Sequence, residues 1–309
     1  MRKLQHVISS RQFTDRQFLQ DLFLSARRME QDDLGRCLLH PLAGRILATL
    51  FYEPSTRTRF SFEAAMQKLG GGVLTAENMR ESSSAVKGET IADTIRVVSG
   101  YADVIAIRHY EEGAAAEAAR LSPVPVINAG DGAGEHPTQA LIDLYTIQKE
   151  LGRLGGLRIA LVGDLRNGRT IHSLLPLFGL YRHDVSFDLI SPPELRLPQK
   201  YREMLEEMGI QYRESDHLGG SVESANVVYI TRVQKERFAH PEEYERVKDT
   251  YIIDAAITAQ LKSDAIIMHA LPRVNEISPE IDTDARAAYF RQAKNGLYLR
   301  MALLNYLLS

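Results

Sequence analysis

Residues 45–62 read RILATLFYEPSTRTRFSF, an apolar run that passes directly into a polar, arginine-rich run. The apolar half, 45–52, is typical of a strand with a buried centre. Pro54 ends this pattern, and apolar residues then recur at helical spacing until the glycines at 70–72. The stretch therefore predicts a strand that turns into a helix.

The first turn of this predicted helix carries hydroxyl and guanidinium groups, on Ser55, Thr56, Arg57 and Thr58. Unpaired backbone N–H groups and the positive end of the helix dipole favour an anion at such a turn. Planar Arg groups add directional hydrogen bonds to phosphate oxygens. We therefore interpret the turn as a phosphate-binding cradle. It is not a nucleotide P-loop, because the sequence has no G-x-x-x-x-G-K-[ST].

A simpler interpretation is that Ser55 or Thr56 only caps the helix while the arginines point into solvent. Two arginines in one first turn count against it, since cations are disfavoured at that end of a helix.

Length and composition limit the class of protein. A chain of 309 residues suits two domains, and 44% hydrophobic with 25% charged residues is typical of a globular protein. The formal charge of −3 argues against a general nucleic-acid binder.

Cys37 is the only cysteine, so no intrachain disulfide can form and a zinc site of the Cys-rich type is absent. The first ten residues contain no apolar stretch of signal-peptide length, and no apolar run of 18 residues follows. We expect a cytoplasmic protein that neither crosses nor binds a membrane.

Strand-like and helical patterns alternate along the chain, which predicts an α/β fold of two domains, each a mostly parallel sheet flanked by helices and joined by interdomain helices. We expect a first domain over 1–136, a linking helix over 137–149, a second domain over 150–289, and a last helix, 290–309, that packs back on the first domain. The predicted strands lie at 45–52, 72–75, 104–108, 124–128, 157–163, 185–190, 226–230, 251–254 and 265–269.

Polar clusters follow most of these strands, and in open α/β sheets ligands bind where the carboxyl ends of strands meet loops. Besides the cradle at 55–59, the clusters are SSSAVKGE (82–89), Arg108-His109, HPTQ (136–139), GDLRNGRT (163–170), TRVQKER (231–237) and HALPR (269–273). The loop at 163–168 lacks G-x-G-x-x-G, which makes a dinucleotide oxidoreductase a poor interpretation.

In this order and at these spacings, the clusters resemble the catalytic chains of aspartate carbamoyltransferase, within the aspartate/ornithine carbamoyltransferase superfamily. The resemblance covers nearly the whole chain. It implies transfer of a carbamoyl group from carbamoyl phosphate to the amine of L-aspartate, an early step of pyrimidine biosynthesis. It implies no cofactor and no metal.

The resemblance also implies roles for single residues. Carbamoyl phosphate is expected to bind Ser55, Thr56, Arg57, Thr58, Ser83, Lys87, Arg108, His136, Gln139, Leu271 and Pro272. Aspartate is expected to bind Lys87, Arg169, Arg232, Gln234 and Leu271. The catalytic groups are expected to be Arg57, Thr58, Lys87, Arg108 and His136, whereas Arg59 is expected to support the domain.

These residue types suit the implied chemistry. Attack of an amine on a carbonyl carbon creates an oxyanion, which Thr58, Arg108 and His136 can stabilise as hydrogen-bond donors. Planar Arg groups bind carboxylates bidentately, as a dicarboxylic substrate requires. A helix start disfavours imidazolium, so we expect His136 to act as a neutral donor.

The resemblance implies a homotrimer in which Ser83 and Lys87 serve the neighbouring chain's site. Allosteric control would need separate regulatory chains, because these 309 residues contain no zinc-binding cysteine cluster. One departure from the family pattern is Ala270, where many relatives have Pro. The alternatives are an ornithine carbamoyltransferase, which the Arg232-Val-Gln234 run disfavours, and a non-catalytic phosphate-binding homologue.

Overall fold

The computed structural model describes residues 4–309, with Ser84 and Ala85 described by their backbone alone. The described chain forms two compact units. The first contains residues up to Ile142 together with Lys294–Ser309, and the second is Asp143–Ala293. The first unit is therefore built from both ends of the chain.

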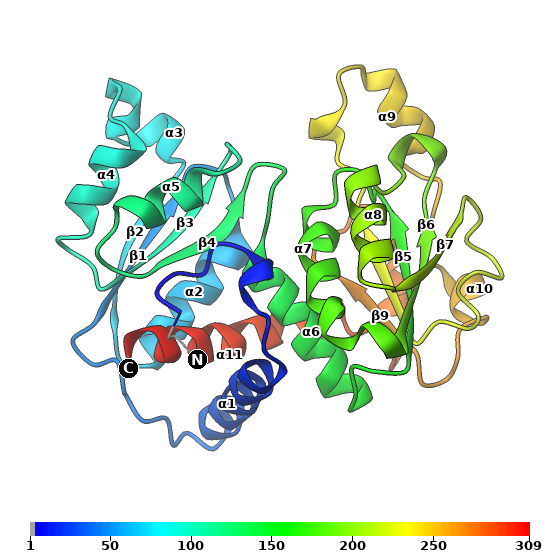
Figure 1. Ribbon diagram of the computed structural model, residues 1–309, viewed down its shortest axis with the longest axis horizontal. Coiled ribbons are helices and arrows are strands. Elements are labelled where there is room, and N and C mark those ends of the chain that lie inside the picture. Colours follow the sequence, from blue (N-terminus) through cyan, green and yellow to red (C-terminus); the bar gives the residue numbers. More distant parts are fainter. Residues whose placement is uncertain (1–3) are drawn as a thin grey trace. The chain divides into compact units, whose positions relative to one another are not determined.

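The first unit holds a four-stranded parallel sheet of order β2-β1-β3-β4 (Figure 1). Its strands are β1 (Ile46–Phe51), β2 (Gly72–Glu77), β3 (Val104–His109) and β4 (Val126–Asp131). Its helices are α1 (Arg16–Leu34), α2 (Thr56–Lys68), α3 (Met79–Ser82), α4 (Ile91–Val98) and α5 (Ala114–Leu121), with short 3₁₀ turns at Ser10–Gln12 and Ser84–Lys87.

The strands of this sheet are apolar because both faces are covered, as expected of parallel strands. Leu47, Ile105 and Val126 are fully buried. The edge strand β2 is the exception, with Leu74 45% exposed.

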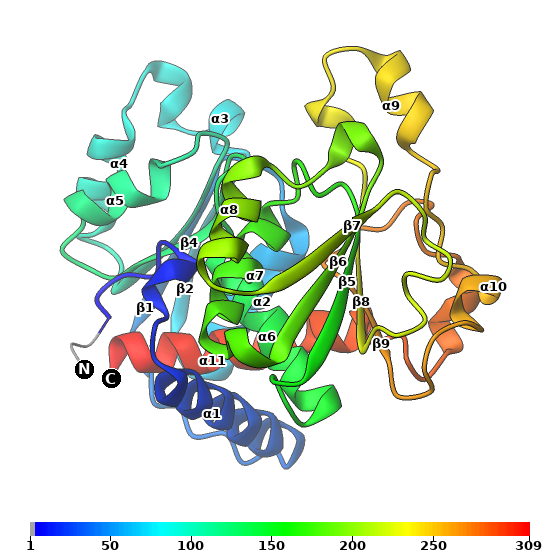
Figure 2. The same ribbon diagram turned by 45° about the vertical axis from the view of Figure 1, so that its right-hand side comes forward.

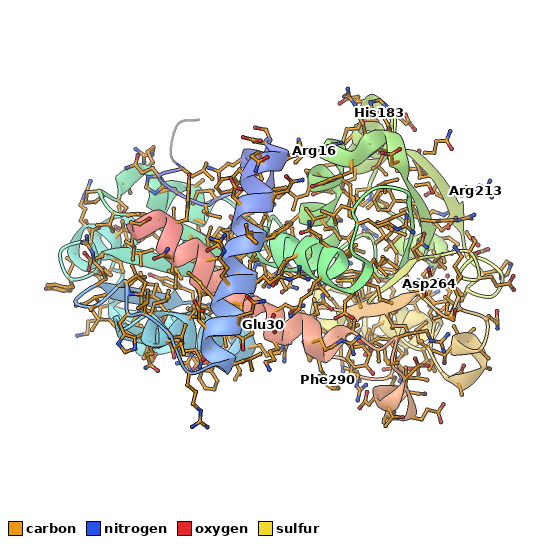
Figure 3. All side chains as sticks on the ribbon, turned by 90° about the horizontal axis from the view of Figure 1, so that it is seen from below. Arg16, Glu30, His183, Arg213, Asp264 and Phe290 are labelled. Carbon is orange, nitrogen blue, oxygen red and sulfur yellow. The ribbon has the colours of Figure 1, made fainter. Side chains whose placement is uncertain are left out.

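Two long helices run from one unit into the other along the chain: α6 (Pro137–Leu151) and α11 (Tyr289–Leu308). The last part of α11 packs within the first unit, where the Tyr298 hydroxyl donates to Asp33 of α1 at 3.1 Å. Figure 3 shows Arg16 and Glu30 near opposite ends of α1.

The second unit holds a five-stranded parallel sheet of order β7-β6-β5-β8-β9, whose twist is visible in Figure 2. Its strands are β5 (Leu157–Gly163), β6 (Val185–Ile190), β7 (Gln211–Ser215), β8 (Val227–Thr231) and β9 (Ile266–His269). Its helices are α7 (Arg169–Phe178), α8 (Gln199–Glu207), α9 (Pro241–Val247) and α10 (Ala255–Thr258), with 3₁₀ turns at Gly179–Asp184, Pro193–Leu195, Lys235–Arg237 and Pro279–Thr283.

The predicted α/β class and parallel sheets are confirmed, with one strand wrong and one missed. The apolar run at 251–254 forms only a single bridge, between Ile253 and Ile277, because its neighbours in space are loops and not strands. The edge strand β7 was not predicted, since its residues are mostly exposed and polar.

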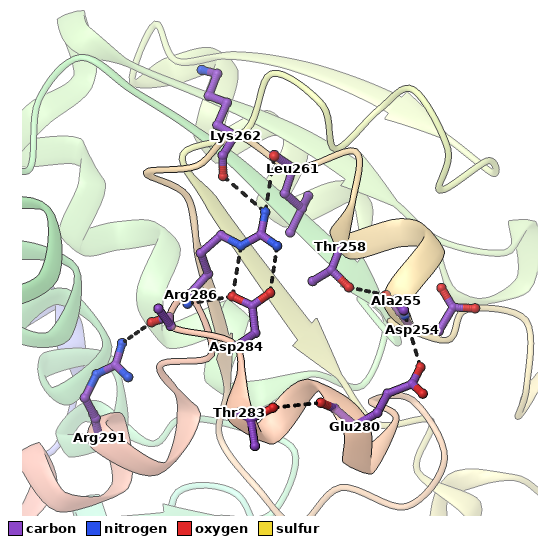
Figure 4. Close-up of polar contacts among 11 residues, drawn as sticks. Asp254, Ala255, Thr258, Leu261, Lys262, Glu280, Thr283, Asp284, Arg286 and Arg291 are labelled. Carbon is purple, nitrogen blue, oxygen red and sulfur yellow. Dashed lines mark hydrogen bonds and ion pairs between the residues drawn. The ribbon is translucent and has the colours of Figure 1, made fainter.

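A group of polar contacts links Arg286, which precedes α11, to Asp284 and to the loop before β9 (Figure 4). The Arg286 guanidinium donates to both carboxylate oxygens of Asp284, at 3.0 and 2.7 Å, and to the carbonyl of Leu261 at 3.2 Å. This pairing fixes the segment that leads into α11.

No described helix, taken over residues 4–309, is both long enough and apolar enough to span a bilayer.

Candidate active site

The cradle lies where the sequence predicts it, at the amino end of α2 directly after β1. Ser55 occupies the N-cap position, and its side chain makes no capping hydrogen bond to the described residues. Thr56 and Arg57 are exposed, whereas Thr58 is buried. The interpretation of Ser55 as a simple cap is therefore wrong, and its hydroxyl is left for another partner.

The two arginines of this turn differ in their surroundings. Arg59 donates to Glu77 at 2.7 Å and to Thr75 at 3.1 Å, both on β2, and lies 3.4 Å from Glu63. Arg59 therefore ties α2 to β2, while Arg57 is exposed at the cradle.

Arg108 lies at the carboxyl end of β3, beside the end of β1. Its carbonyl accepts the Tyr52 N–H at 2.8 Å, and its guanidinium is 3.4 Å from the Glu53 carboxylate. A further hydrogen bond, of 3.3 Å, goes to the Ala129 carbonyl on β4. These contacts hold Arg108 over the same sheet edge from which α2 starts.

His136 follows β4 and immediately precedes α6. The side chain is buried, and its Nδ1 lies 3.5 Å from the hydroxyl of Thr138. The carbonyl of His136 accepts the Gln139 N–H at 3.0 Å, which places both residues on the first turn of α6. The cradle, Arg108 and His136 thus follow the carboxyl ends of three neighbouring strands.

A buried arginine that the sequence analysis missed supports this edge from α11. Arg300 donates to Ser61 of α2 at 2.7 Å and to Thr138 of α6 at 3.4 Å, and its guanidinium lies 4.7 Å from the Phe62 ring centroid. The only sequence signal was a single charge within the apolar run LYLRMALL of the last helix.

Ser83 and Lys87 follow β2 on the loop between α3 and α4. The Ser83 hydroxyl donates to the Met79 carbonyl at 2.5 Å, and Lys87 is exposed. The loop extends the same sheet edge beyond β2.

In the second unit, the loop after β5 and the loop after β8 meet. Gln234 donates its side-chain amide to the Asn167 carbonyl at 2.8 Å, and its backbone N–H to Asp164 at 3.4 Å. Burial raises the pKa of Asp164, which also accepts hydrogen bonds from Asn167. Arg169 begins α7 at the end of the first of these loops.

Arg232 forms a bidentate ion pair with Glu236, at 2.6 and 3.2 Å. Burial is the largest single influence on Glu236 and raises its pKa, but the hydrogen bond to Arg232, a backbone hydrogen bond and the charges of Arg232 and Arg237 together outweigh it, so the pKa of Glu236 is lowered. The Arg232 guanidinium therefore already holds a carboxylate in the geometry expected for a dicarboxylic ligand. The spacing of four residues between them is visible in the sequence.

The loop after β9 carries Leu271 and Pro272 and is shaped by two buried side chains. His269 Nδ1 accepts the Leu271 N–H at 2.8 Å, and its Nε2 lies 2.9 Å from the carboxylate of Glu276. Leu271 adopts a φ of +56°, which a non-glycine residue rarely takes. Glu276, which holds His269, was not among the residues predicted from the sequence.

Each half of the chain matches a model of a known protein domain. Residues 5–149 match the carbamoyl-P binding domain of aspartate/ornithine carbamoyltransferase, and residues 155–307 match its Asp/Orn binding domain. Among similar proteins, the chain is 52% identical over 307 residues to a chloroplastic aspartate carbamoyltransferase of Arabidopsis thaliana, covering 99% of this chain and 78% of that protein. It is 53% identical over 270 residues to an aspartate carbamoyltransferase catalytic subunit of Clostridium kluyveri, covering 87% and 88%.

Solved structures agree with these sequence matches. The catalytic subunit of M. jannaschii aspartate transcarbamoylase has a TM-score of 0.91 at 47% identity, with 98% of both chains covered. The Trypanosoma cruzi aspartate transcarbamoylase in complex with carbamoyl phosphate and aspartate has a TM-score of 0.94 at 41% identity, covering 99% of this chain and 98% of that one. With both halves matched and identity near one half over almost its full length, this chain belongs to the aspartate/ornithine carbamoyltransferase family.

Proposed function

We propose that this protein transfers the carbamoyl group of carbamoyl phosphate to the amine of L-aspartate, giving N-carbamoyl-L-aspartate and phosphate for pyrimidine biosynthesis. The observation that carries the proposal is the 52% identity over 99% of the chain to a protein named aspartate carbamoyltransferase. The solved structure most relevant to it is the Trypanosoma cruzi enzyme with both substrates bound.

The first unit supplies the groups for carbamoyl phosphate. Ser55, Thr56, Arg57 and Thr58 hold the phosphate at the amino end of α2, where free N–H groups and the helix dipole favour an anion. Support comes from the Ser55 hydroxyl, which makes no capping bond to the described residues, and from the exposure of Arg57.

Donors at the neighbouring strand ends act on the carbamoyl group. Arg108, His136 and Thr58 stabilise the oxyanion that forms when the amine attacks, and Gln139 holds the carbamoyl amino group. Loss of one such donor lowers turnover by roughly 10²–10³ in other enzymes. The aspartate amine is itself the nucleophile, so no side chain needs to act as one, and the amine loses its proton to the departing phosphate.

The second unit supplies the groups for aspartate. Arg169, Arg232 and Gln234 bind the two carboxylates, and the main-chain carbonyls of Leu271 and Pro272 accept from the amines. The bidentate pairing of Arg232 with Glu236 supports this role, because aspartate presents the same carboxylate group.

An assay of phosphate release tests the proposal. Purified protein is mixed with carbamoyl phosphate and either L-aspartate or L-ornithine, and released phosphate is followed over time. We expect release with aspartate alone. Release with ornithine alone would make the protein an ornithine carbamoyltransferase, the other activity named for the family, and no release with either would make it a non-catalytic homologue.

We also propose that the working enzyme is a cytoplasmic homotrimer, with Ser83 and Lys87 completing the site of a neighbouring chain, and that any allosteric control comes from separate regulatory chains. The exposure of Lys87 supports a role outside its own fold. Mass photometry of the purified protein measures the assembly; a monomer at working concentration would contradict the trimer.

A further inference from the structure

The segment before α1 is fastened along β4, the strand that leads to His136. The Val7 N–H donates to the Val126 carbonyl, and the Asn128 N–H donates to the Val7 carbonyl, both at 2.8 Å. The Asn128 side chain also donates to the Ile8 carbonyl at 3.0 Å. Val7 and Ser10 are fully buried, so this segment is an integral part of the first unit.

Glu135 joins this segment to the turn between β4 and α6. One of its carboxylate oxygens accepts the Ser9 hydroxyl at 2.6 Å. The other accepts the Ser10 N–H at 2.7 Å and the Ser10 hydroxyl at 2.9 Å. Three donors on one carboxylate, with charge-assisted bonds, fix the direction in which the Glu135 side chain leaves the backbone.

The backbone of Glu135 is fixed as well. Its N–H donates to the Asp131 side chain at 3.1 Å, and its carbonyl accepts the Asp131 N–H at 3.2 Å. Asp131 is in turn held by the N–H of Gly113 and by the Asn128 amide, each at 3.0 Å. The residue that follows Glu135 therefore leaves a turn whose side chain and backbone are both fixed by hydrogen bonds.

That residue is His136. We propose that Glu135, held by Ser9 and Ser10, is a positioning residue for His136, and that the segment Val7–Gln12 is thereby part of the catalytic apparatus. Glu135 touches no reacting atom in this scheme; it sets the place and angle at which the imidazole is presented. The inference rests on the proposed function, in which His136 donates to the developing oxyanion.

Two variants remove the support without touching His136. Glu135→Gln replaces one acceptor oxygen by an amide NH₂, which cannot accept from the Ser9 or Ser10 donors. Ser10→Ala removes one donor alone, and is cleaner than a change at Ser9, whose hydroxyl also accepts the Arg11 N–H. We expect kcat to fall about ten- to a hundredfold in Glu135→Gln, since small misplacements of a catalytic group have effects of that size, and by a smaller factor in Ser10→Ala.

The matched control is Asp103→Asn in the same unit. The Asp103 carboxylate accepts Arg45 at 2.7 Å and the Ile46 N–H at 2.8 Å, at the amino end of β1 and so away from the catalytic strand ends. We expect its kcat to match the unsubstituted protein. Inorganic phosphate affinity, measured by calorimetry, and the melting temperature are recorded for every variant, and we expect phosphate affinity to change less than about twofold in all.

A double-mutant cycle separates positioning from general stability. In a His136→Ala background, Glu135→Gln has no imidazole left to position, so we expect no further loss of kcat. A full additional loss in that background, or a kcat in Glu135→Gln equal to that of Asp103→Asn, would overturn the inference. If the unsubstituted protein releases no phosphate from the two substrates, the proposed function fails instead.

Discussion

Within one helical turn, Arg57 and Arg59 have different surroundings. Arg59 is 13% exposed and ion-paired to Glu63 and Glu77, so Arg59→Ala leaves two carboxylates without their cation. We expect it to lower the free energy of unfolding by about 2 kcal/mol. Arg57→Ala, an exposed position, should change stability by less than about 0.5 kcal/mol but abolish phosphate binding.

Urea denaturation and phosphate calorimetry on the same two proteins check this contrast. The assignment of Arg57 fails if its alanine variant binds phosphate as the unsubstituted protein does.

Arg232 gives a second prediction at the scale of one residue. Because its guanidinium accommodates a carboxylate, Arg232→Ala should raise the KM for aspartate and lower kcat. Phosphate affinity, which we propose depends on the first unit, should stay the same. Steady-state kinetics with aspartate varied at saturating carbamoyl phosphate measure both constants. Unchanged aspartate kinetics would reject the role.

At the scale of an element, we expect α7 to make the stability of the protein depend on pH. His172 is buried on this helix, donates from Nε2 to the Leu165 carbonyl at 2.9 Å, and stacks on Tyr201 of α8. Burial lowers the pKa of His172 to about 4. Its folded pKa is thus below the unfolded value of about 6.5, so the stability it contributes is complete above pH 6.5 and is lost as the pH falls toward 4.

That loss amounts to about 3 kcal/mol over this range. Urea midpoints measured from pH 7 to pH 4 should therefore fall more steeply in the unsubstituted protein than in His172→Gln. The control is His183→Gln at an exposed position, which should keep the steep fall. Equal slopes in all three proteins would contradict a buried neutral His172.

Helices and strands could be predicted from the sequence where burial of one or both faces requires a regular pattern of apolar residues. Strands β5 and β6 and the helix α11 have the predicted bounds, to within a residue, because both faces of those strands and one side of that helix are buried. The strand β7 left no such pattern, since an edge strand needs little apolar surface. The apolar run at 251–254 resembles a buried strand and was wrongly predicted as one. Burial among loops selects the same apolar residues as burial in a sheet.

For the candidate site, the sequence marks the residues proposed to face a ligand more clearly than the residues that support them. The cradle and Arg108 stand in recognisable runs. The supporting contacts join residues that meet only through the fold: Glu77 of β2 forms an ion pair with Arg59 of α2, and Glu135 accepts a hydrogen bond from Ser9, 126 positions earlier in the chain. Local spacing carries no trace of such a pair.

At the scale of the whole molecule, the proposed trimer makes a prediction about mixtures. Lys87→Ala and Arg57→Ala chains are each expected to be inactive. When the two are unfolded, mixed and refolded, some hybrid trimers should contain one site with neither substitution, and phosphate release with aspartate should return in part. Each variant refolded alone is the control; a mixture as inactive as the controls would argue against a site shared between chains.

The first unit contains residues from both ends of the chain, so it cannot complete its packing until the last helix has been synthesised. Tyr298 and Arg300, which contact Asp33 and Ser61, leave the ribosome long after their partners. At about 5–20 residues per second, the roughly 150 residues between Ile142 and Lys294 take roughly 8 to 30 s to translate. During that time the amino-terminal part of the first unit lacks the helix that completes its packing. A premature stop codon late in the gene would remove that helix and so destabilise the unit that was synthesised first.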